Sequence, residues 1–141
     1  MDAETRAVHI DGPARLALVD HVLDALDDLW TDAPHVGAED RTLFTLAVSE
    51  VATNMVQHTA EPDSVTITVD IRISPAQVEA TLTDTAPPAE IDWDGVAMPE
   101  PDSESGRGLA LSTASLDDLR HVFDAGGNTW LLRRRIRSTQ P

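Results

Sequence analysis

The sequence predicts an α+β fold, a two-layer sandwich in which helices cover one face of a mostly antiparallel sheet. Two long segments in the first half carry apolar residues at helical spacing, and the later segments alternate apolar and polar residues as paired strands do. Helices followed by runs of paired strands are typical of this class. With 141 residues, 41% of them apolar, the chain suits a single domain, which we expect to span residues 1–141.

The first half is expected to contain a short strand and two helices. Residues 6–10 alternate weakly, as a short strand does, and the helical segment 11–30 follows with Pro13 in its first turn. Its apolar residues form one stripe: Leu16, Val19, Val22, Leu23, Leu26 and Leu29. Residues 38–60 form the second helix, which ends at the Glu-Pro-Asp sequence that follows.

The second half is expected to contain two hairpins separated by a long loop. Residues 64–73 and 78–84 alternate strongly as strands, and residues 120–125 and 129–137 flank a Gly-Gly-Asn turn. The alternation of the last strand places Arg133, Arg135 and Arg137 on one exposed face. Residues 85–106 are rich in Pro, Asp and Gly, and loops of this length are commonly functional or disordered. Helical character resumes over residues 107–119.

Composition excludes several classes of function. The net charge is −15, which argues against direct binding to nucleic acid or to an anionic membrane. All ten basic residues are arginine and there is no cysteine, so lysine phosphate loops, thiolate nucleophiles and cysteine zinc sites are excluded. No apolar run reaches membrane-spanning length, and we expect a cytoplasmic protein. A nucleotide remains compatible with this charge, because a few arginines and backbone amides can hold phosphates.

Three polar residues lie within the second predicted helix, each four positions after the one before. With Glu50 at zero on a helical wheel, Asn54 lies at about 40° and His58 at about 80°, which leads obliquely into the apolar stripe around Val51. One interpretation is a polar margin with a hydrogen-bonded core histidine. The other is a pocket lining, in which a carboxylate accepts a proton and an amide oxygen binds a hard cation.

Two further segments contain candidate binding residues. In the sequence SGRGLAL (residues 105–111), Gly106 and Gly108 flank Arg107 at the start of a predicted helix, where free N–H groups can bind an anion; a simple loop exit has the same pattern. Asp84 ends a predicted strand and begins the long loop. It suits either an Asx turn or an acceptor for the exocyclic amine of a ligand.

Together and in this order, these segments resemble motifs of the GHKL (Bergerat-type) ATP-binding fold, and within it the small anti-sigma-factor serine kinases of the RsbW type. The sequence EVATNMVQH (residues 50–58) resembles the N-box E-x-x-x-N-x-x-x-H. The resemblance implies that Glu50 is the general base, Asn54 the Mg²⁺ ligand and His58 a residue on the phosphate side of ATP.

The other motifs of the family are also recognisable. The sequence SGRGL resembles the second glycine box, which implies that the ATP phosphates are wrapped by Gly106, Arg107, Gly108 and Leu109. The sequence GNTWLLRR resembles the closing strands, where Thr129 would help to hold the adenine pocket. Asp84 would accept the adenine amino group, and the loop after it would be the ATP lid. The sequence DTAPP departs from the pattern, because Ala86 stands where the family has its first glycine and prolines follow.

The resemblance implies an ATP- and Mg²⁺-dependent serine/threonine-protein kinase that regulates transcription. Its substrate would be a serine of a STAS-domain anti-anti-sigma protein, and it would sequester a partner such as a sigma factor, with a homodimer compatible with this role. An alternative is a non-catalytic regulatory module on the same fold with weak or no ATP binding, which the DTAPP sequence favours. A third interpretation is the ATPase domain of a sensor histidine kinase. The sequence shows no dimerisation and phosphoacceptor helix pair ahead of the predicted domain, which argues against this interpretation.

Overall fold

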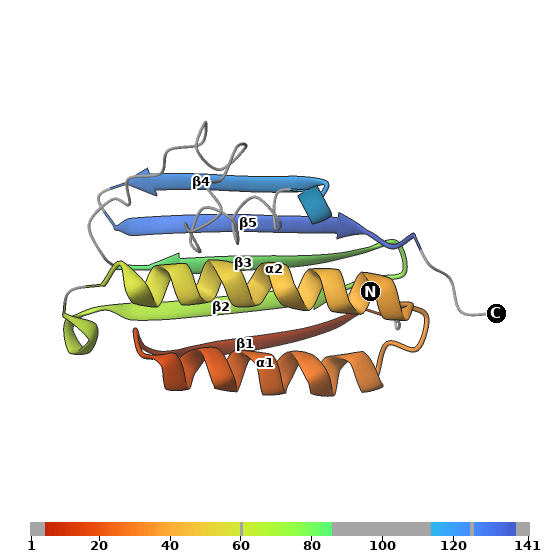
Figure 1. Ribbon diagram of the computed structural model, residues 1–141, viewed down its shortest axis with the longest axis horizontal. Helices are drawn as coiled ribbons and strands as arrows, with labels where there is room; N and C mark the ends of the chain where they lie inside the picture. Colours follow the sequence, from red (N-terminus) through yellow and green to blue (C-terminus); the bar gives the residue numbers. More distant parts are fainter. Residues whose placement is uncertain (1–4, 60, 86–113, 125, 138–141) are drawn as a thin grey trace, which may run out of the picture.

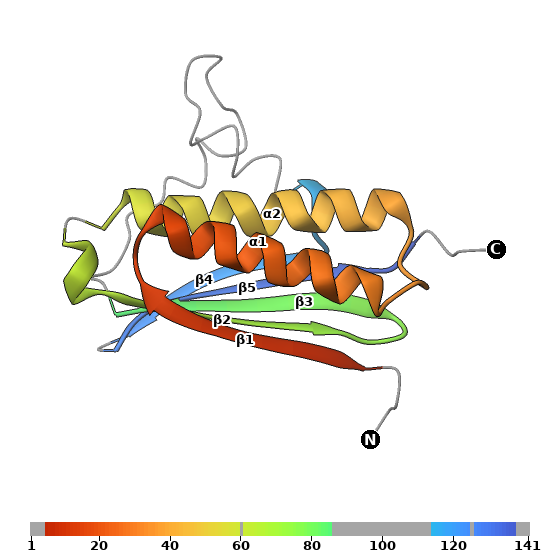
Figure 2. The ribbon, with the colours of Figure 1, turned by 90° about the horizontal axis from the view of Figure 1, so that it is seen from below.

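The computed structural model describes residues 5–59, 61–85, 114–124 and 126–137 (Figure 1). In these residues five strands form one sheet in the order β1–β2–β3–β5–β4, and every pairing is antiparallel. The strands are β1 (Arg6–Pro13), β2 (Thr66–Ile73), β3 (Gln77–Asp84), β4 (Asp118–Asp124) and β5 (Gly127–Arg135). The helices α1 (Leu16–Thr31) and α2 (Ala38–Gln57) lie on one side of the sheet, so the predicted α+β sandwich is confirmed (Figure 2).

Strand alternation divides the sheet into a helix-facing side and an open side. On β3, Val78, Ala80, Leu82 and Asp84 are buried, and the residues between them are partly exposed. Since successive side chains of a strand point to opposite faces, the buried set faces the helices. The core under α1 and α2 is continued by Trp130 and Leu132 of β5, each 1% exposed. Neither described helix is long and apolar enough to cross a membrane.

The predicted start of the first helix is wrong. Pro13 is the last residue of β1, where it pairs with Thr66, and α1 begins at Leu16. An edge strand tolerates proline because one side of the strand needs no N–H donor. The apolar stripe is confirmed at Val19, Val22, Leu26 and Leu29, but Leu16 is 60% exposed and Leu18 is buried instead.

The predicted helix over residues 107–119 is wrong at its end. Residues 107–113 lie outside the described part of the chain, whereas Asp118 and Leu119 belong to β4. Asp118 pairs with Arg133 of β5, whose Nε donates to Asp118 Oδ2 at 2.8 Å. Pairing with β5 therefore extends the strand two residues beyond the local sequence pattern.

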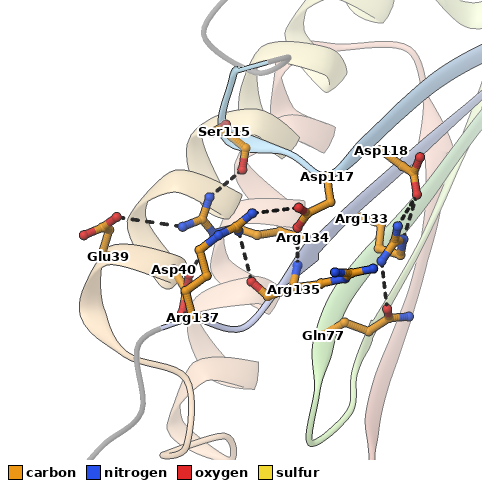
Figure 3. Close-up of polar contacts among 10 residues, drawn as sticks. All are labelled: Glu39, Asp40, Gln77, Ser115, Asp117, Asp118, Arg133, Arg134, Arg135 and Arg137. Carbon is orange, nitrogen blue, oxygen red and sulfur yellow. Dashed lines mark hydrogen bonds and ion pairs between the residues drawn. The ribbon is translucent and has the colours of Figure 1, made fainter.

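The arginines of β5 and the residues after it alternate as expected. Arg135 and Arg137 are exposed and Arg133 is half-buried, whereas Arg134 between them is only 4% exposed. Its Nε donates to Asp40 Oδ1 of α2 at 2.8 Å, and its Nη1 donates to the Ser115 carbonyl at 2.5 Å (Figure 3). Through these two contacts, Arg134 joins the end of β5 to the start of α2 and to the residues before β4.

Candidate functional site

The polar row of α2 passes through the edge of the core. Asn54 is buried with 6% of its surface exposed, Glu50 is half-buried, and His58 is exposed. The neighbouring Val51 and Met55 are buried in the core. Glu50 and Asn54 therefore lie at the edge of the core, as the helical wheel predicted, but the prediction is wrong at His58, which is exposed and is not a core histidine.

His58 lies at the end of α2, which stops three residues before the predicted end of the helix. The His58 backbone N–H donates to the Asn54 carbonyl at 3.1 Å, and the Thr59 hydroxyl donates to the Met55 carbonyl at 2.8 Å. These bonds satisfy carbonyl groups that have no partner within the helix. The helix end thus holds the His58 backbone and leaves its ring exposed.

The last turns of α2 lie at the same end of the molecule as the end of β3 and the start of β5 (Figures 1 and 2). α2 also packs against both of these strands. The topology therefore brings the polar row of α2 to the end of the sheet where Asp84 lies.

Asp84 is held on the helix-facing side of the sheet by a residue of β5. It is 7% exposed and lies opposite Asn128 in the β3–β5 pairing. Its Oδ1 accepts from the Asn128 backbone N–H at 3.2 Å and from the Asn128 side-chain Nδ2 at 2.9 Å. An oxygen that accepts two N–H groups is fixed in orientation.

Gly127 makes this approach of β5 to Asp84 possible. Its φ is +130°, and a Cβ at this position would lie 1.8 Å from the Asp84 carbonyl oxygen. A side chain here would force β5 away from β3, because backbone atoms cannot yield in the way a flexible side chain can. The glycine before Asn128 is therefore part of the construction of the site.

The structure separates Thr129 from the helix-facing side of this site. Thr129 pairs with Thr83 on β3, one position out of phase with Asp84 and Asn128. Its side chain belongs to the open side with those of Thr66, Thr68 and Thr83, and these residues line a pocket whose edge also includes Asp84 and Asn128. On the helix-facing side of β5, the side chain of Asn128 donates to the Asp84 carboxylate.

The sequence missed two residues that the structure brings to Asp84. The sequence places Asn128 only in a turn and assigns no role to His121. In the structure, His121 Nε2 lies 2.9 Å from Asn128 Oδ1. The signal for Asn128 is the register of β3 and β5, which the sequence of either strand alone does not contain. The second glycine segment, Gly106 to Leu109, lies outside the described residues.

The donor types at this end of the molecule suit a metal–nucleotide ligand. Hard cations such as Mg²⁺ prefer oxygen ligands, and the buried amide of Asn54 supplies such an oxygen one turn from the carboxylate of Glu50. At the end of β3, on the side of the sheet that faces the helices, Asp84 supplies an acceptor that suits an exocyclic amine. α2 and the strands thus carry complementary chemistry for the two ends of a nucleotide.

Comparisons with known proteins show the family and the fold of the chain. The model of the family described as "Histidine kinase-like ATPase domain" matches residues 12–134. Among curated proteins, none matches the chain. The chain belongs to the histidine kinase-like ATPase domain family, which implies ATP binding and an activity of the kinase or ATPase type in general.

Two solved structures share the fold. One contains the RsbU and RsbW domains of Rv1364c from Mycobacterium tuberculosis, with a TM-score of 0.69 at 22% identity over 96% of this chain. The chain spans 34% of the length of that protein. The other is the histidine kinase domain of the blue-light activated histidine kinase EL346 from Erythrobacter litoralis, with a TM-score of 0.57 at 18% identity, covering 88% of this chain and 61% of that one. At these identities the likeness shows the GHKL fold alone.

Proposed function

We propose that this chain is an ATP- and Mg²⁺-dependent serine/threonine-protein kinase that works as a cytoplasmic regulatory switch. The observation that carries the proposal is the arrangement at one end of the molecule: Glu50 and Asn54 at the edge of the core on α2, and Asp84 buried at the end of β3. The family match supports the nucleotide, and the N-box sequence supports the phosphotransfer.

Each residue of the site has a proposed role in binding. Asn54 holds Mg²⁺ through its amide oxygen, and the ion neutralises phosphate charge that an acidic protein would otherwise repel. His58 contacts the phosphates from the end of α2. Asp84 accepts the adenine amine. The glycine segment with Gly106, Arg107, Gly108 and Leu109 is assigned to the phosphates from sequence alone.

Glu50 is the proposed general base of phosphoryl transfer. It accepts the proton of a substrate serine hydroxyl, whose oxygen forms a bond to the γ-phosphorus of ATP. The bond between that phosphorus and the β–γ bridging oxygen breaks, and ADP leaves with the electron pair. The products are a phosphoserine protein, ADP and the proton, which Glu50 holds and then releases to water, so atoms and charge balance.

The proposed substrate is a serine of a STAS-domain anti-anti-sigma protein. The N-box and glycine-box sequences support it, because they resemble those of RsbW-type kinases. Phosphorylation adds negative charge to the interface with this acidic protein and weakens that complex. The chain, as a monomer or homodimer, is then available to bind a second partner such as a sigma factor.

The experiment is a calorimetric titration with ATP, with and without Mg²⁺, on wild type and Asn54→Ala. We expect Mg²⁺-dependent binding in the wild type and a loss of about tenfold or more in affinity in the variant, because it removes a metal ligand. Gln57→Ala, at an exposed position of the same helix, is the matched control and should bind as the wild type does. Glu50→Gln should bind ATP but lose phosphoryl transfer to a STAS-domain substrate.

Three outcomes would contradict the proposal in different ways. Transfer by Glu50→Gln at the wild-type rate would remove the general base. Unchanged binding by Asn54→Ala would remove the metal ligand. Failure of the wild type to bind ATP would favour the non-catalytic binding module, for which Ala86 in place of the family's glycine is the specific observation.

A further inference from the structure

A chain of hydrogen bonds crosses three strands at the end of the sheet that carries Asp84. Asp84 of β3 accepts from Asn128 of β5 at 2.9 Å, and Asn128 Oδ1 lies 2.9 Å from His121 Nε2 of β4. Asn128 is 2% exposed and His121 is half-buried. The three side chains therefore form one polar line on the helix-facing side of the sheet.

Chemistry fixes the direction of this chain. A carboxylate cannot donate, so the Asn128 group beside Asp84 must be its NH₂. The amide oxygen of Asn128 then faces His121 and must accept, which requires a hydrogen on His121 Nε2. Each group in the line can therefore donate only towards Asp84.

The aromatic neighbours of His121 hold its ring in place. The ring lies over Trp130, with the two centroids 4.5 Å apart and the planes inclined by 31°. Trp130 is 1% exposed and part of the core, so it provides a rigid base for the imidazole. The position of Nε2 is thereby set by packing on one side and by Asn128 on the other.

We propose that Asn128 and His121 are positioning residues that hold the Asp84 carboxylate as an acceptor for an exocyclic amine, and that they thereby make the site select ATP over GTP. Adenine presents an NH₂ group where guanine presents a carbonyl oxygen. A carboxylate held as an acceptor gains a hydrogen bond with adenine and meets an unpaired oxygen with guanine, which is the strong form of discrimination. The inference rests on the proposed function and deepens it.

The test compares the affinities for ATP and GTP in variants of the two positioning residues. His121→Phe keeps an aromatic ring over Trp130 and removes the donor. It should weaken ATP binding by about three- to tenfold, the effect of one hydrogen bond, and leave GTP binding unchanged. Asn128→Leu should reduce the ratio of ATP to GTP affinity further. His121→Gln restores a donor and should recover part of the ratio, and His21→Phe, at an exposed position of α1, is the control.

A second measurement needs no variant and no nucleotide. ¹⁵N NMR of the neutral His121 ring should show the hydrogen on Nε2. A neutral ring with its hydrogen on Nδ1 would overturn the inference, as would an unchanged affinity ratio in folded His121→Phe and Asn128→Leu. A change in the ratio on Thr129→Val, with none on Asn128→Leu, would assign the role to the open side of the sheet instead.

Failure of the proposed function and failure of the proposed positioning pair give different results. If the wild type binds neither nucleotide, the proposed function is wrong and the selectivity falls with it, whatever the NMR spectrum shows. If the wild type binds ATP in a Mg²⁺-dependent way but the selectivity ignores His121 and Asn128, only the positioning pair is wrong.

Discussion

His9 is held between two carboxylates on the open side of the sheet. Its Nδ1 lies 2.6 Å from Asp70 Oδ1, directly across the β1–β2 pairing, and its Nε2 lies 3.2 Å from Asp11 Oδ2. The hydrogen bond to Asp70, followed by that to Asp11, raises the pKa of His9 above its ordinary value of about 6.5. The protonated ring can donate to both carboxylates at once.

The raised pKa predicts a stability contribution that depends on pH. A group whose pKa is higher in the folded than in the unfolded state stabilises the fold fully below the unfolded pKa, and this contribution is lost as the pH rises through the folded pKa. His9→Gln should therefore lower the unfolding temperature more at about pH 5.5 than at about pH 9.

NMR titration of the ring provides the independent check on His9. Asp70→Asn, which removes the largest cause of the shift, should lower the His9 midpoint. A wild-type midpoint at or below about 6.5 would contradict the role of the two carboxylates.

At the scale of single residues, the sequence showed the polar groups of α2 but missed those around Asp84. Glu50 and Asn54 follow the helical repeat within α2, so their common side can be inferred from spacing alone, whereas His58 lies beyond the last residue of the helix and is exposed. Asn128 meets Asp84 only through the register of β3 and β5, because the two residues are 44 positions apart in the sequence. His121 reaches this group through Asn128, which strand β4 brings beside it. The sequence predicts Thr129 as the adenine-pocket residue of the last strand, whereas the structure places Asn128, one position earlier, against Asp84.

At the scale of elements, the buried ion pair between Arg134 and Asp40 joins β5 to the N-terminal turn of α2. Asp40 is 1% exposed, and its Oδ2 also accepts from the Arg137 backbone N–H at 2.9 Å (Figure 3). Removing one partner of a buried pair leaves the other charge without compensation, which commonly costs more than the pair itself contributes. The same helix carries the proposed general base and metal ligand, so this contact positions the element as well as stabilising it.

Asp40→Ala should lower the free energy of unfolding by about 3–5 kcal/mol, measured by urea denaturation. Glu39→Ala is the matched control: Glu39 lies 3.9 Å from the same arginine but its side chain is 74% exposed, so its loss should cost about 1 kcal/mol or less. The double variant Asp40→Leu/Arg134→Met should be more stable than Asp40→Ala. Equal costs for Asp40→Ala and Glu39→Ala would show that the buried pair has no special role.

Most elements could be predicted because their periods are local, and the errors fall where tertiary pairing decides. β2 and β3 are strongly alternating, and their observed bounds lie close to the predicted ones. Pro13 and Asp118 were placed in helices on local signals, but each pairs with a neighbouring strand, with Thr66 and Arg133 respectively. Arg134 could be assigned to the inner side of the last strand by alternation, but its partner, Asp40, lies 94 residues away.

At the scale of the whole molecule, the net charge of −15 opposes the compact state. The repulsion is concentrated on α1, where Asp20, Asp24 and Asp28 are exposed at successive i+4 positions. Asp28 also lies near the C-terminal end of α1, whose last turn carries no basic residue, so it is placed unfavourably in the helix dipole.

Screening this repulsion should stabilise the protein. Raising NaCl from about 20 mM to about 300 mM shortens the range of surface electrostatics. We expect an increase of about 4 °C in the unfolding temperature, equivalent to about 1 kcal/mol for a chain of this size. Asp24→Asn/Asp28→Asn should unfold at a higher temperature than the wild type at low salt and respond less to added salt.

Arg120→Gln gives the opposite control for the charge argument. It removes an exposed positive charge whose acidic neighbour, Asp118, lies at 3.9 Å, so it should increase the response to salt. Calorimetric scans of the wild type, Asp24→Asn/Asp28→Asn and Arg120→Gln at both salt concentrations test whether the salt effect comes from the acidic surface. If all three respond equally, the salt effect does not come from the acidic surface. If the response follows the net charge, the same surface also favours a basic face on any protein partner, because complementary charge speeds association.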